Sequence, residues 1–342
     1  MILVRDKGQM CNNIFQFAHS YAWARENGIR AVSMRFAYKY QYFKICHTKY
    51  HNLFFYLLGK WGAALKLIPV ADFNTPNAAH IAANEQKLMK HSHLCVLEGW
   101  HIRYFDLVDK YLDEIRELFS FDASVIKSAE SKLNELTTKH DHLIGVHIRR
   151  GDYATFMGGR FYLSDDCYID CIRQTASLMP DDKTPTVVIC SNDRKLRIDY
   201  FRQQLPGMNV TLSNGNAAED LYTLSQCSHI IGPASSFSLV ATLYGKARLA
   251  FISKEVGKIT TDSFCDFTTM SRRFDKYFAI LYSYRDKSKQ GNFLLRNLRA
   301  MPILYYLAYQ HKLIDALIDR PNKAGDTVAN TAFQYISFKK AK

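Results

Sequence analysis

Two adjacent arginines and an aspartate follow an apolar run in the segment HIRRGDY at residues 147–153. Residues 143–148 are predicted to form a strand, so Arg149 begins the loop at its carboxyl end. A guanidinium group can bind two phosphate oxygens at once and stays charged at any working pH. Alternation puts His147 and Arg149 on one face and Arg150 on the other, so we expect one arginine at a ligand and one in a structural role. The segment predicts a site for a pyrophosphate leaving group; the alternative is a surface cluster of salt bridges.

Serines and aspartates supply further candidate positions. The segment ASSFS at 234–238 opens a predicted helix, where hydroxyl and backbone N–H groups could bind an anion, although the serines could equally be helix N-caps. Asp220 lies near the start of the preceding helix and could accept hydrogen bonds from a base or sugar, or only complement the helix dipole. Residues 191–193, Ser-Asn-Asp, follow a predicted buried strand at 186–190.

The elements that must position these residues alternate between strand and helix. Asn12 is predicted to cap the first helix, and a second helix, at 120–137, is predicted to close the first domain. Residues 37–90 predict only mixed helix and loop. Strands are predicted at 2–5, 29–36, 94–97, 143–148, 186–190 and 229–231. The alternation predicts an α/β fold in which two Rossmann-like domains face each other across a cleft.

Composition and charge narrow the class of protein. The 342 residues are 48% hydrophobic with a net charge of +13, which excludes disordered and collagen-like chains and favours anionic partners. No stacking sheet of aromatic and basic residues or RNA-binding module is visible, so nucleic acid is not an expected partner. The eight cysteines show no paired framework, and no apolar run is long enough to span a bilayer, which predicts a cytoplasmic protein.

The C-terminal tail holds over half of the net charge. Residues 281–342 contain 11 Lys or Arg and 4 Asp or Glu, and the segment 293–307 is apolar and aromatic. Lysines and arginines near an anionic leaflet each contribute about 1 kcal/mol of attraction. The tail predicts peripheral contact with the cytoplasmic face of an anionic membrane, or a helix packed as core.

Four spaced motifs resemble those of a known family. They are GQMCNNIFQFA at 8–18, HIRRGDY at 147–153, SND at 191–193 and SSFS at 235–238. In sequence and order they are similar to the motifs of bacterial α1,2-fucosyltransferases, glycosyltransferase family 11. The His-x-Arg-Arg element is shared with the wider superfamily of α1,2-, α1,6- and protein O-fucosyltransferases. The resemblance extends from residue 2 to about residue 255.

The resemblance implies a GT-B fold, GDP-β-L-fucose as donor, inversion at the anomeric carbon, and no required metal or cofactor. Arg149 would hold the donor's β-phosphate and His147 would lie near the nucleotide. Asp220 would lie near guanine, with Asp193 in the same donor-binding set, and Ser235 and Ser236 would lie near the pyrophosphate. A missing Asp-x-Asp ahead of a strand end agrees with metal independence, because arginine would supply the positive charge.

The acceptor side is less closely matched. Asn12 corresponds to the Asn of the family's opening loop and would face the sugar or acceptor, but residues 9–13 read Gln-Met-Cys-Asn-Asn where the family usually has Gly-Leu-Gly-Asn-Gln. Glu98 and Trp100, at a predicted strand end, are acceptor-side candidates. Asp152 is the first candidate base and Glu98 the second; Asp152 could instead be a salt-bridge partner of Arg150, and a dissociative reaction could proceed without a strong base.

The predicted function is transfer of L-fucose to a glycan or lipid-linked oligosaccharide, at galactose O-2 in α1,2 linkage, in surface polysaccharide or oligosaccharide synthesis. The alternatives are a related nucleotide-sugar transferase with another linkage or sugar, and a non-catalytic glycan- or RNA-binding protein; Arg149 favours an enzyme. Three parts are predicted: an acceptor-side domain at 1–140, a donor-binding domain at 141–270 and a basic helical extension at 271–342.

Overall fold

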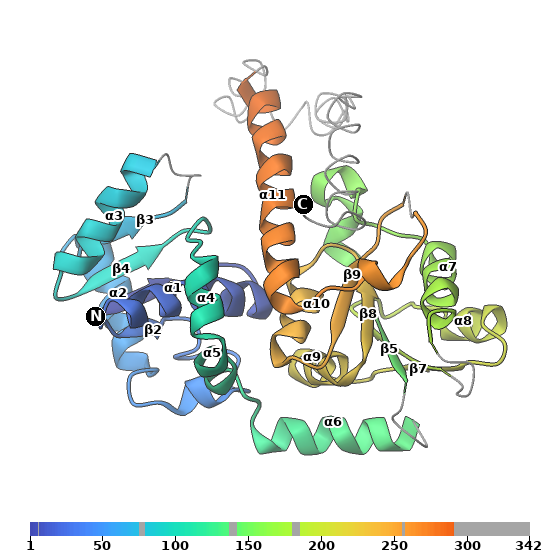
Figure 1. The fold of residues 1–342 in the computed structure, drawn as a ribbon. Helices are drawn as coiled ribbons and strands as arrows, with labels where there is room; N and C mark the ends of the chain where they lie inside the picture. The colour runs from blue at the N-terminus through green and yellow to red at the C-terminus, as the bar shows by residue number, and fades with distance from the viewer. Residues whose placement is uncertain (6, 75–78, 137–141, 180–184, 255–256, 291–342) are drawn as a thin grey trace, which may run out of the picture.

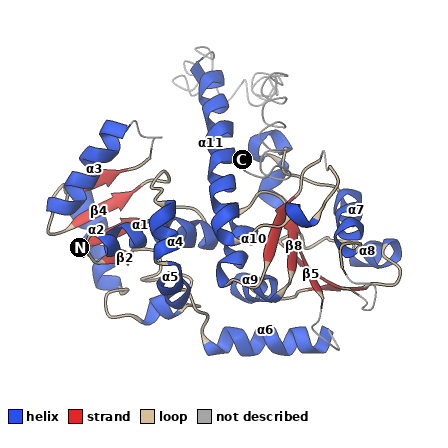
Figure 2. Ribbon diagram, viewed as in Figure 1, coloured by secondary structure: helices blue, strands red, loops and turns tan. Residues whose placement is uncertain are grey.

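Two parallel sheets, each accompanied by helices, form the two halves of the molecule (Figure 1, Figure 2). The computed structural model describes residues 1–5, 7–74, 79–136, 142–179, 185–254 and 257–290. The basic tail beyond residue 290, with its predicted helix, lies outside the described residues. Within the described part, no helix combines the length and apolarity needed to cross a membrane. The predicted α/β fold with two Rossmann-like units is confirmed.

The first sheet has the strand order β2-β1-β4-β3. Its strands are β1 (Ile2–Arg5), β2 (Ala31–Ser33), β3 (Val70–Asp72) and β4 (Cys95–Glu98). Helix α1 (Met10–Glu26) follows β1, and most of its residues are buried. The prediction that Asn12 caps this helix is wrong. The extended backbone of Gln9 begins the helix instead, so Asn12 lies in the first turn and its side chain is directed elsewhere.

Among the described residues, five further helices belong to the first half. They are η1 (Lys44–His47), α2 (Leu53–Ala64), α3 (Ala79–His91), α4 (Phe105–Lys110) and α5 (Leu112–Leu118). The region 37–90, for which the sequence predicted only mixed helix and loop, holds the first three helices and also strand β3. A strand of three residues is too short to show alternation, which explains why the sequence did not indicate it.

The second sheet has the strand order β7-β6-β5-β8-β9. Its strands are β5 (Leu143–Ile148), β6 (Thr186–Ser191), β7 (Asn209–Leu212), β8 (His229–Gly232) and β9 (Arg248–Phe251). The helices are α7 (Asp165–Ala176), α8 (Ile198–Gln204), α9 (Ala217–Gln226), α10 (Ser236–Ala241) and α11 (Phe267–Gln290), with 3₁₀ turns η2 (Gly151–Ala154), η3 (Phe156–Gly159), η4 (Thr242–Tyr244) and η5 (Thr261–Ser263). Chain order reverses between β5 and β8, and open α/β sheets bind ligands at such a point.

Helix α6 (Ala123–Leu136) lies against α9 of the second half (Figure 1). Ser128 donates a hydrogen bond to Glu219 at 2.6 Å, and Lys132 pairs with the same carboxylate at 2.8 Å. These contacts attach α6 to α9 of the second half, while the division of the chain at residue 140 stays a prediction. Periodicity indicates that a helix exists, but it does not say which sheet the helix covers.

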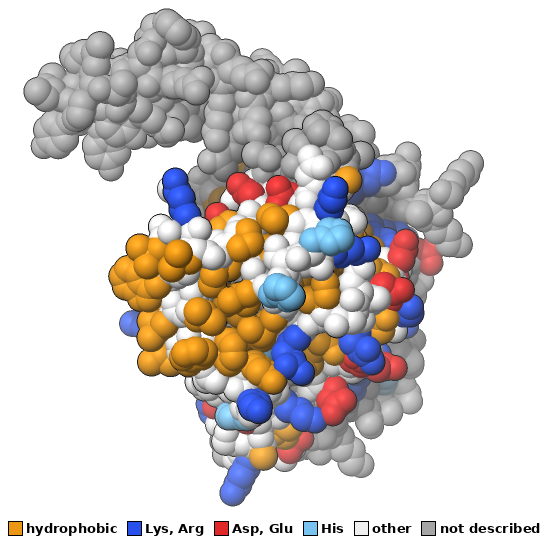
Figure 3. Space-filling view, turned by 90° about the vertical axis from the view of Figure 1, so that its left-hand side faces the viewer, with side chains coloured by type: hydrophobic (Ala, Val, Ile, Leu, Met, Phe, Trp, Pro, Cys, Tyr) orange, Lys and Arg blue, Asp and Glu red, His pale blue; other side chains and the backbone are white. Residues whose placement is uncertain are grey.

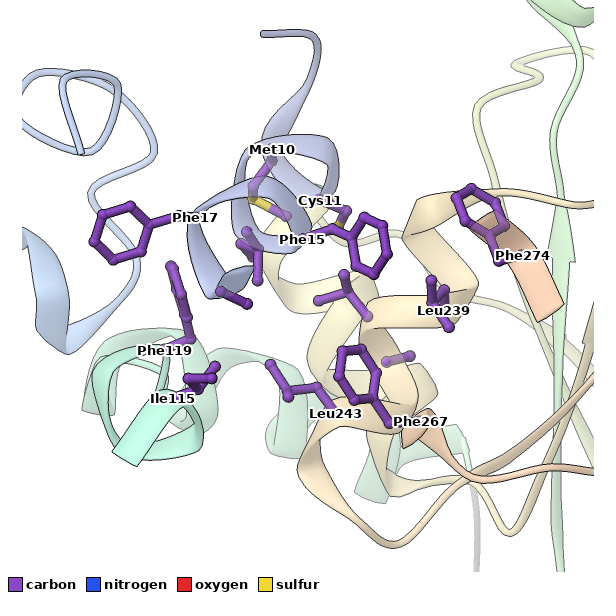
Figure 4. Packing of buried hydrophobic residues seen from close by; sticks show 14 of the residues in the cluster. Met10, Cys11, Phe15, Phe17, Ile115, Phe119, Leu239, Leu243, Phe267 and Phe274 are labelled. Atoms are coloured by element: carbon purple, nitrogen blue, oxygen red, sulfur yellow. The ribbon is translucent and has the colours of Figure 1, made fainter. Parts of the chain in front are cut away.

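One hydrophobic core continues from the first half into the second (Figure 4). Phe15 of α1 meets Phe274 of α11 with ring centroids 5.9 Å apart, and Leu239 of α10 lies in the same cluster. An ion pair crosses beside this core, from Arg103 to Asp275 at 2.6 Å. The two sheets are therefore held together by packing and not only by the connecting chain.

Candidate active site

Arg149 lies at the point where the chain order of the second sheet reverses. It follows β5, and its Nη1 donates a hydrogen bond to Ser235 Oγ, which follows β8, at 3.2 Å. Ser235 also caps α10 by accepting a hydrogen bond from the backbone N–H of Phe237 at 3.3 Å. Ser235 is therefore both a helix cap and a hydrogen-bond partner of Arg149. The contact joins two of the sequence motifs across the switch point.

The rest of the guanidinium is held by its own loop. Asp152 accepts from Nη2 at 2.8 Å and from Nε at 3.3 Å, in a bidentate pair. The guanidinium carbon lies 4.3 Å from the centroid of the Tyr153 ring, and the Tyr153 hydroxyl donates to the Ala234 carbonyl at 2.9 Å. Arg149, not Arg150, is therefore the salt-bridge partner of Asp152, because the 3₁₀ turn after Arg150 folds the carboxylate back toward β5.

Arg150 has a structural role, as expected for one of the two arginines. Its side chain is 13% exposed, pairs with Asp165 and with Asp193 (at 3.4 Å), and donates to the Leu163 carbonyl. The carboxylate of Asp193, predicted to bind the donor, is thus engaged by Arg150 and by the Lys195 backbone N–H at 2.9 Å. In this structure Asp193 fixes the loop that follows β6.

His147 is buried beneath the Arg149 loop. Its ring lies 5.0 Å from the Phe237 ring, and a Cβ on Gly232 would come within 3.0 Å of the histidine Cβ. Burial, and then the charge of Arg149, lower the pKa of His147 to about 3, so the imidazole is neutral at neutral pH. Its Nδ1 is buried and has no hydrogen-bond partner within the described residues. An unpaired buried nitrogen is a group that a bound ligand could satisfy.

Asp220 lies at the same edge of the sheet, beside the loop that follows β7. Its Oδ1 accepts a hydrogen bond from the Ser213 hydroxyl at 2.6 Å, and the Gly215 backbone N–H also bonds to the carboxylate. A side chain at Gly215 would come within 2.7 Å of that oxygen. Burial raises the pKa of Asp220 to about 7. The sequence did not single out Ser213 and Gly215, since the short strand β7 that precedes them gave no motif.

The opening loop of the first half reaches this edge through Asn12. Ser236 donates a hydrogen bond to the Asn12 side chain, joining α10 to α1. Gly8 has a φ of +85° and leaves no room for a side chain beside Asn12, so the loop depends on a glycine there. Neighbouring Cys11 is buried close enough to Arg149 for the guanidinium charge to act on its thiol, although burial dominates and raises the thiol pKa.

Glu98 and Trp100 lie at the carboxyl end of β4 in the first half. Glu98 pairs with Arg5 at 2.9 Å, and the Trp100 ring centroid lies 4.7 Å from the guanidinium carbon of Arg103. The structure thus places each of these two acceptor-side candidates beside an arginine of the first half. A separate group of predicted site residues comes together around the ends of β5 and β8: Arg149, Asp152, Ser235, Ser236, His147 and Asn12. Among the described residues, no three His, Cys, Asp or Glu form a group suited to a metal ion.

Comparisons with solved structures identify the same fold elsewhere. A mutant of FUT1 from Arabidopsis thaliana, in complex with GDP, has a TM-score of 0.53 and 14% identity, covering 78% of this chain and 73% of that chain. The fucosyltransferase NodZ from Bradyrhizobium has a TM-score of 0.51 and 13% identity, covering 78% of this chain and 98% of that chain. At these identities the likeness concerns the fold. A comparison with curated proteins finds no significant match.

A family assignment comes from the sequence comparison. The family model described as glycosyl transferase family 11 matches residues 66–256, more than half of the chain. The match includes the strand ends that carry Arg149, Asp193 and Ser235. The chain belongs to glycosyl transferase family 11.

Proposed function

We propose that this protein transfers L-fucose from GDP-β-L-fucose to a glycan hydroxyl, as the bacterial α1,2-fucosyltransferases do. The observation that carries the proposal is the position of Arg149, which spans the switch point of the second sheet and bonds to Ser235. Similar folds bind GDP in the FUT1 complex, which supports a guanine nucleotide as the donor's leaving group. The retained arginine favours an enzyme over a silent glycan-binding protein.

Arg149 is proposed to bind the β-phosphate of the donor. In the bidentate pair with Asp152 the guanidinium donates hydrogen bonds to two oxygens of one anion, as binding of a phosphate would require. Asp152 is 57% exposed, so we expect it to turn toward solvent when a phosphate takes its position. Ser236 and the unpaired Nδ1 of His147 would supply further polar contacts, and Asp220 would accept hydrogen bonds from the guanine edge.

The proposed reaction inverts the anomeric carbon. The acceptor oxygen forms a bond to C1 of fucose while the bond from C1 to the β-phosphate oxygen breaks, and the electron pair stays on that phosphate oxygen. Arg149 stabilises this developing charge, so the reaction is proposed to need no metal. The acceptor proton must pass to a base or to water. Both candidate carboxylates are ion-paired, Asp152 with Arg149 and Glu98 with Arg5, so either must leave its arginine before it can act.

The acceptor is proposed to be a galactose O-2 of a glycan or lipid-linked oligosaccharide, bound between residues 1–140 and the donor-binding part at 141–270. We place the reaction in the cytoplasm, as a step of surface polysaccharide or oligosaccharide synthesis. Support for the acceptor side is the hydrogen bond from Ser236 to Asn12, which brings the opening loop of the first half to the donor edge of the second.

A donor panel tests the proposal without knowledge of the acceptor. The purified chain is incubated with labelled GDP-fucose, GDP-mannose and UDP-galactose, and released sugar and nucleotide are measured. We expect slow hydrolysis of GDP-fucose alone, abolished in Arg149→Ala and retained in a control, Arg248→Ala, whose arginine pairs with Asp266 away from the site. Turnover of another donor instead would contradict the donor assignment, and the product formed with galactosides gives the linkage.

A further inference from the structure

Helix α2 presents apolar side chains to solvent, the reverse of an ordinary surface helix. Of its outward positions, only Lys60 and the capping residue Asn52 are polar. Six side chains, named here the α2 patch, belong to the helix and the turn that follows it: Leu53 (57% exposed), Phe54 (66%), Leu57 (39%), Trp61 (57%), Leu65 (65%) and Leu67 (76%). Figure 3 shows a continuous hydrophobic area on the side of the molecule that carries α2.

The opposite side of α2 is fixed to the first sheet, so the patch cannot rotate inward. A Cβ on Gly59 would lie within 3.0 Å of Met34 and Leu3, and one on Gly62 would meet Ile68. These glycines let the helix backbone lie close to the small core around β1 and β2. The helix ends in a turn in which the Leu67 backbone N–H bonds to the Gly62 carbonyl at 2.8 Å, with Lys66 at a φ of 57°. This left-handed turn holds Leu65 and Leu67 outward.

The charged residues in the stretch of sequence that carries the α2 patch have one sign. Between Glu26 and Asp72 the sequence contains no Asp or Glu, and it contains Arg30, Arg35, Lys39, Lys44, Lys49, Lys60 and Lys66. Lys60 lies 5.3 Å from the centroid of the Trp61 ring, and Lys66 stands between Leu65 and Leu67. Basic side chains interleaved with exposed Leu, Phe and Trp are typical of helices that lie in the interface of an anionic bilayer, where the ammonium groups reach the headgroups.

Charge also argues against two other occupants of the patch. A second copy of this chain, related by a two-fold axis, would bring Lys60 and Lys66 of the two copies against one another. The chain's own segment 291–342 is itself basic, with eight Lys or Arg and three Asp or Glu, so it would be repelled in the same way. An anionic lipid surface complements both the apolar and the charged parts.

We propose that the α2 patch docks the protein on an anionic lipid bilayer, with Phe54 and Trp61 inserted at the boundary between headgroups and acyl chains. The helix lies on the membrane and does not cross it, since its 12 residues are too few to span a bilayer. This site is separate from the basic tail, and it places the membrane against the half of the molecule that carries α1.

Vesicle flotation of the full chain tests the proposal. Vesicles of phosphatidylcholine alone are compared with vesicles of phosphatidylcholine and phosphatidylglycerol, at low and high salt. We expect the chain to float only with the anionic vesicles, and more strongly at low salt. Phe54→Ser with Trp61→Ser should weaken partition about a hundredfold, since each large apolar side chain contributes about tenfold. Lys60→Glu with Lys66→Glu should weaken it by at least tenfold.

Two controls keep the result specific. Lys246→Glu with Lys258→Glu makes the same change of net charge at exposed positions of the second half and should leave flotation little changed. Trp61 is 57% exposed whereas Trp23 is 3% exposed, so tryptophan emission should shift to the blue on binding anionic vesicles. Trp61→Phe should lose most of this shift while the protein still floats. Circular dichroism and donor hydrolysis confirm that each variant is folded.

Three results would overturn the proposal. The first is a wild-type chain that does not bind anionic vesicles. The second is equal flotation of the wild type and the Phe54→Ser, Trp61→Ser variant, which would assign binding to another segment such as the basic tail. The third is a wild-type dimer in vesicle-free buffer that the same variant converts to a monomer, which would assign the α2 patch to a second copy.

Discussion

Asp220 offers a test that joins stability to donor binding. Burial raises the pKa of its carboxyl from the ordinary value of 3.8 to about 7. At 1.36 kcal/mol per pKa unit, ionised Asp220 destabilises the fold by about 4 kcal/mol. Because the folded-state pKa is the higher one, this loss of stability is absent below pH 3.8, grows between pH 3.8 and about 7, and is complete above about pH 7.

The perturbation is Asp220→Asn. The asparagine side chain has nearly the same shape as that of aspartate, and its carbonyl oxygen can still accept the hydrogen bond from Ser213. The variant cannot ionise. We therefore expect its free energy of unfolding to exceed that of the wild type by up to about 4 kcal/mol at about pH 8, and to match it at about pH 4. Urea denaturation followed by tryptophan fluorescence at the two pH values measures the difference. Groups common to both proteins, such as His147, cancel from it.

The same variant should bind GDP more weakly. An amide presents one acceptor where an ionised carboxylate presents two to the guanine edge, so we expect a loss of at least tenfold in affinity. Wild-type affinity should also fall below about pH 7 as Asp220 takes up its proton, while the affinity of the variant stays flat. A stability difference that is equal at both pH values would refute the burial argument. Unchanged GDP binding would refute the guanine assignment instead.

Three further predictions concern the arginines and the metal. Arg149→Lys should lower kcat/KM for GDP-fucose about a hundredfold, or about 3 kcal/mol, because an ammonium cannot bind two phosphate oxygens in one plane; near wild-type kinetics would refute the phosphate assignment. Arg150→Gln should lower the free energy of unfolding by about 3 kcal/mol, since it leaves Asp165, 9% exposed, with only the exposed Arg197; urea denaturation measures this, and an unchanged midpoint would contradict it. Activity should survive EDTA, and complete loss restored by magnesium or manganese would contradict the metal-independent mechanism.

The sequence predicted the strands that carry the site better than the contacts at their ends. Strand β5 is buried at every residue and was predicted with its observed bounds. A continuous apolar run that is followed directly by charged residues indicates a buried strand and also marks where it ends. Sequence spacing also indicated that Arg149 and Arg150 face opposite ways. It could not show that Asp152 pairs with Arg149, because that contact depends on the 3₁₀ turn at Gly151–Ala154.

The sequence also could not predict contacts between residues that are far apart in the chain. The hydrogen bond between Asn12 and Ser236 joins residues 224 positions apart, and local patterns say nothing about such a pair. Asn12 was expected at a helix cap because Asn is a common capping residue. In the structure Asn12 lies in the first turn, where its side chain accepts a hydrogen bond from Ser236. The α2 patch was missed because an apolar helix normally indicates core, and only the structure shows which side faces solvent.

The continuous core of α1, α10 and α11 has a mechanical consequence. Swinging the two halves apart would expose Phe15, Leu239 and Phe274 to water and would break the ion pair of Arg103 with Asp275. The relative orientation of the halves is therefore set when the chain folds, and substrates meet a preformed site. The same feature couples the folding of the two sheets, so heat should melt them in one calorimetric peak. It also means that neither half would be stable when expressed alone, since each would keep an uncovered apolar face.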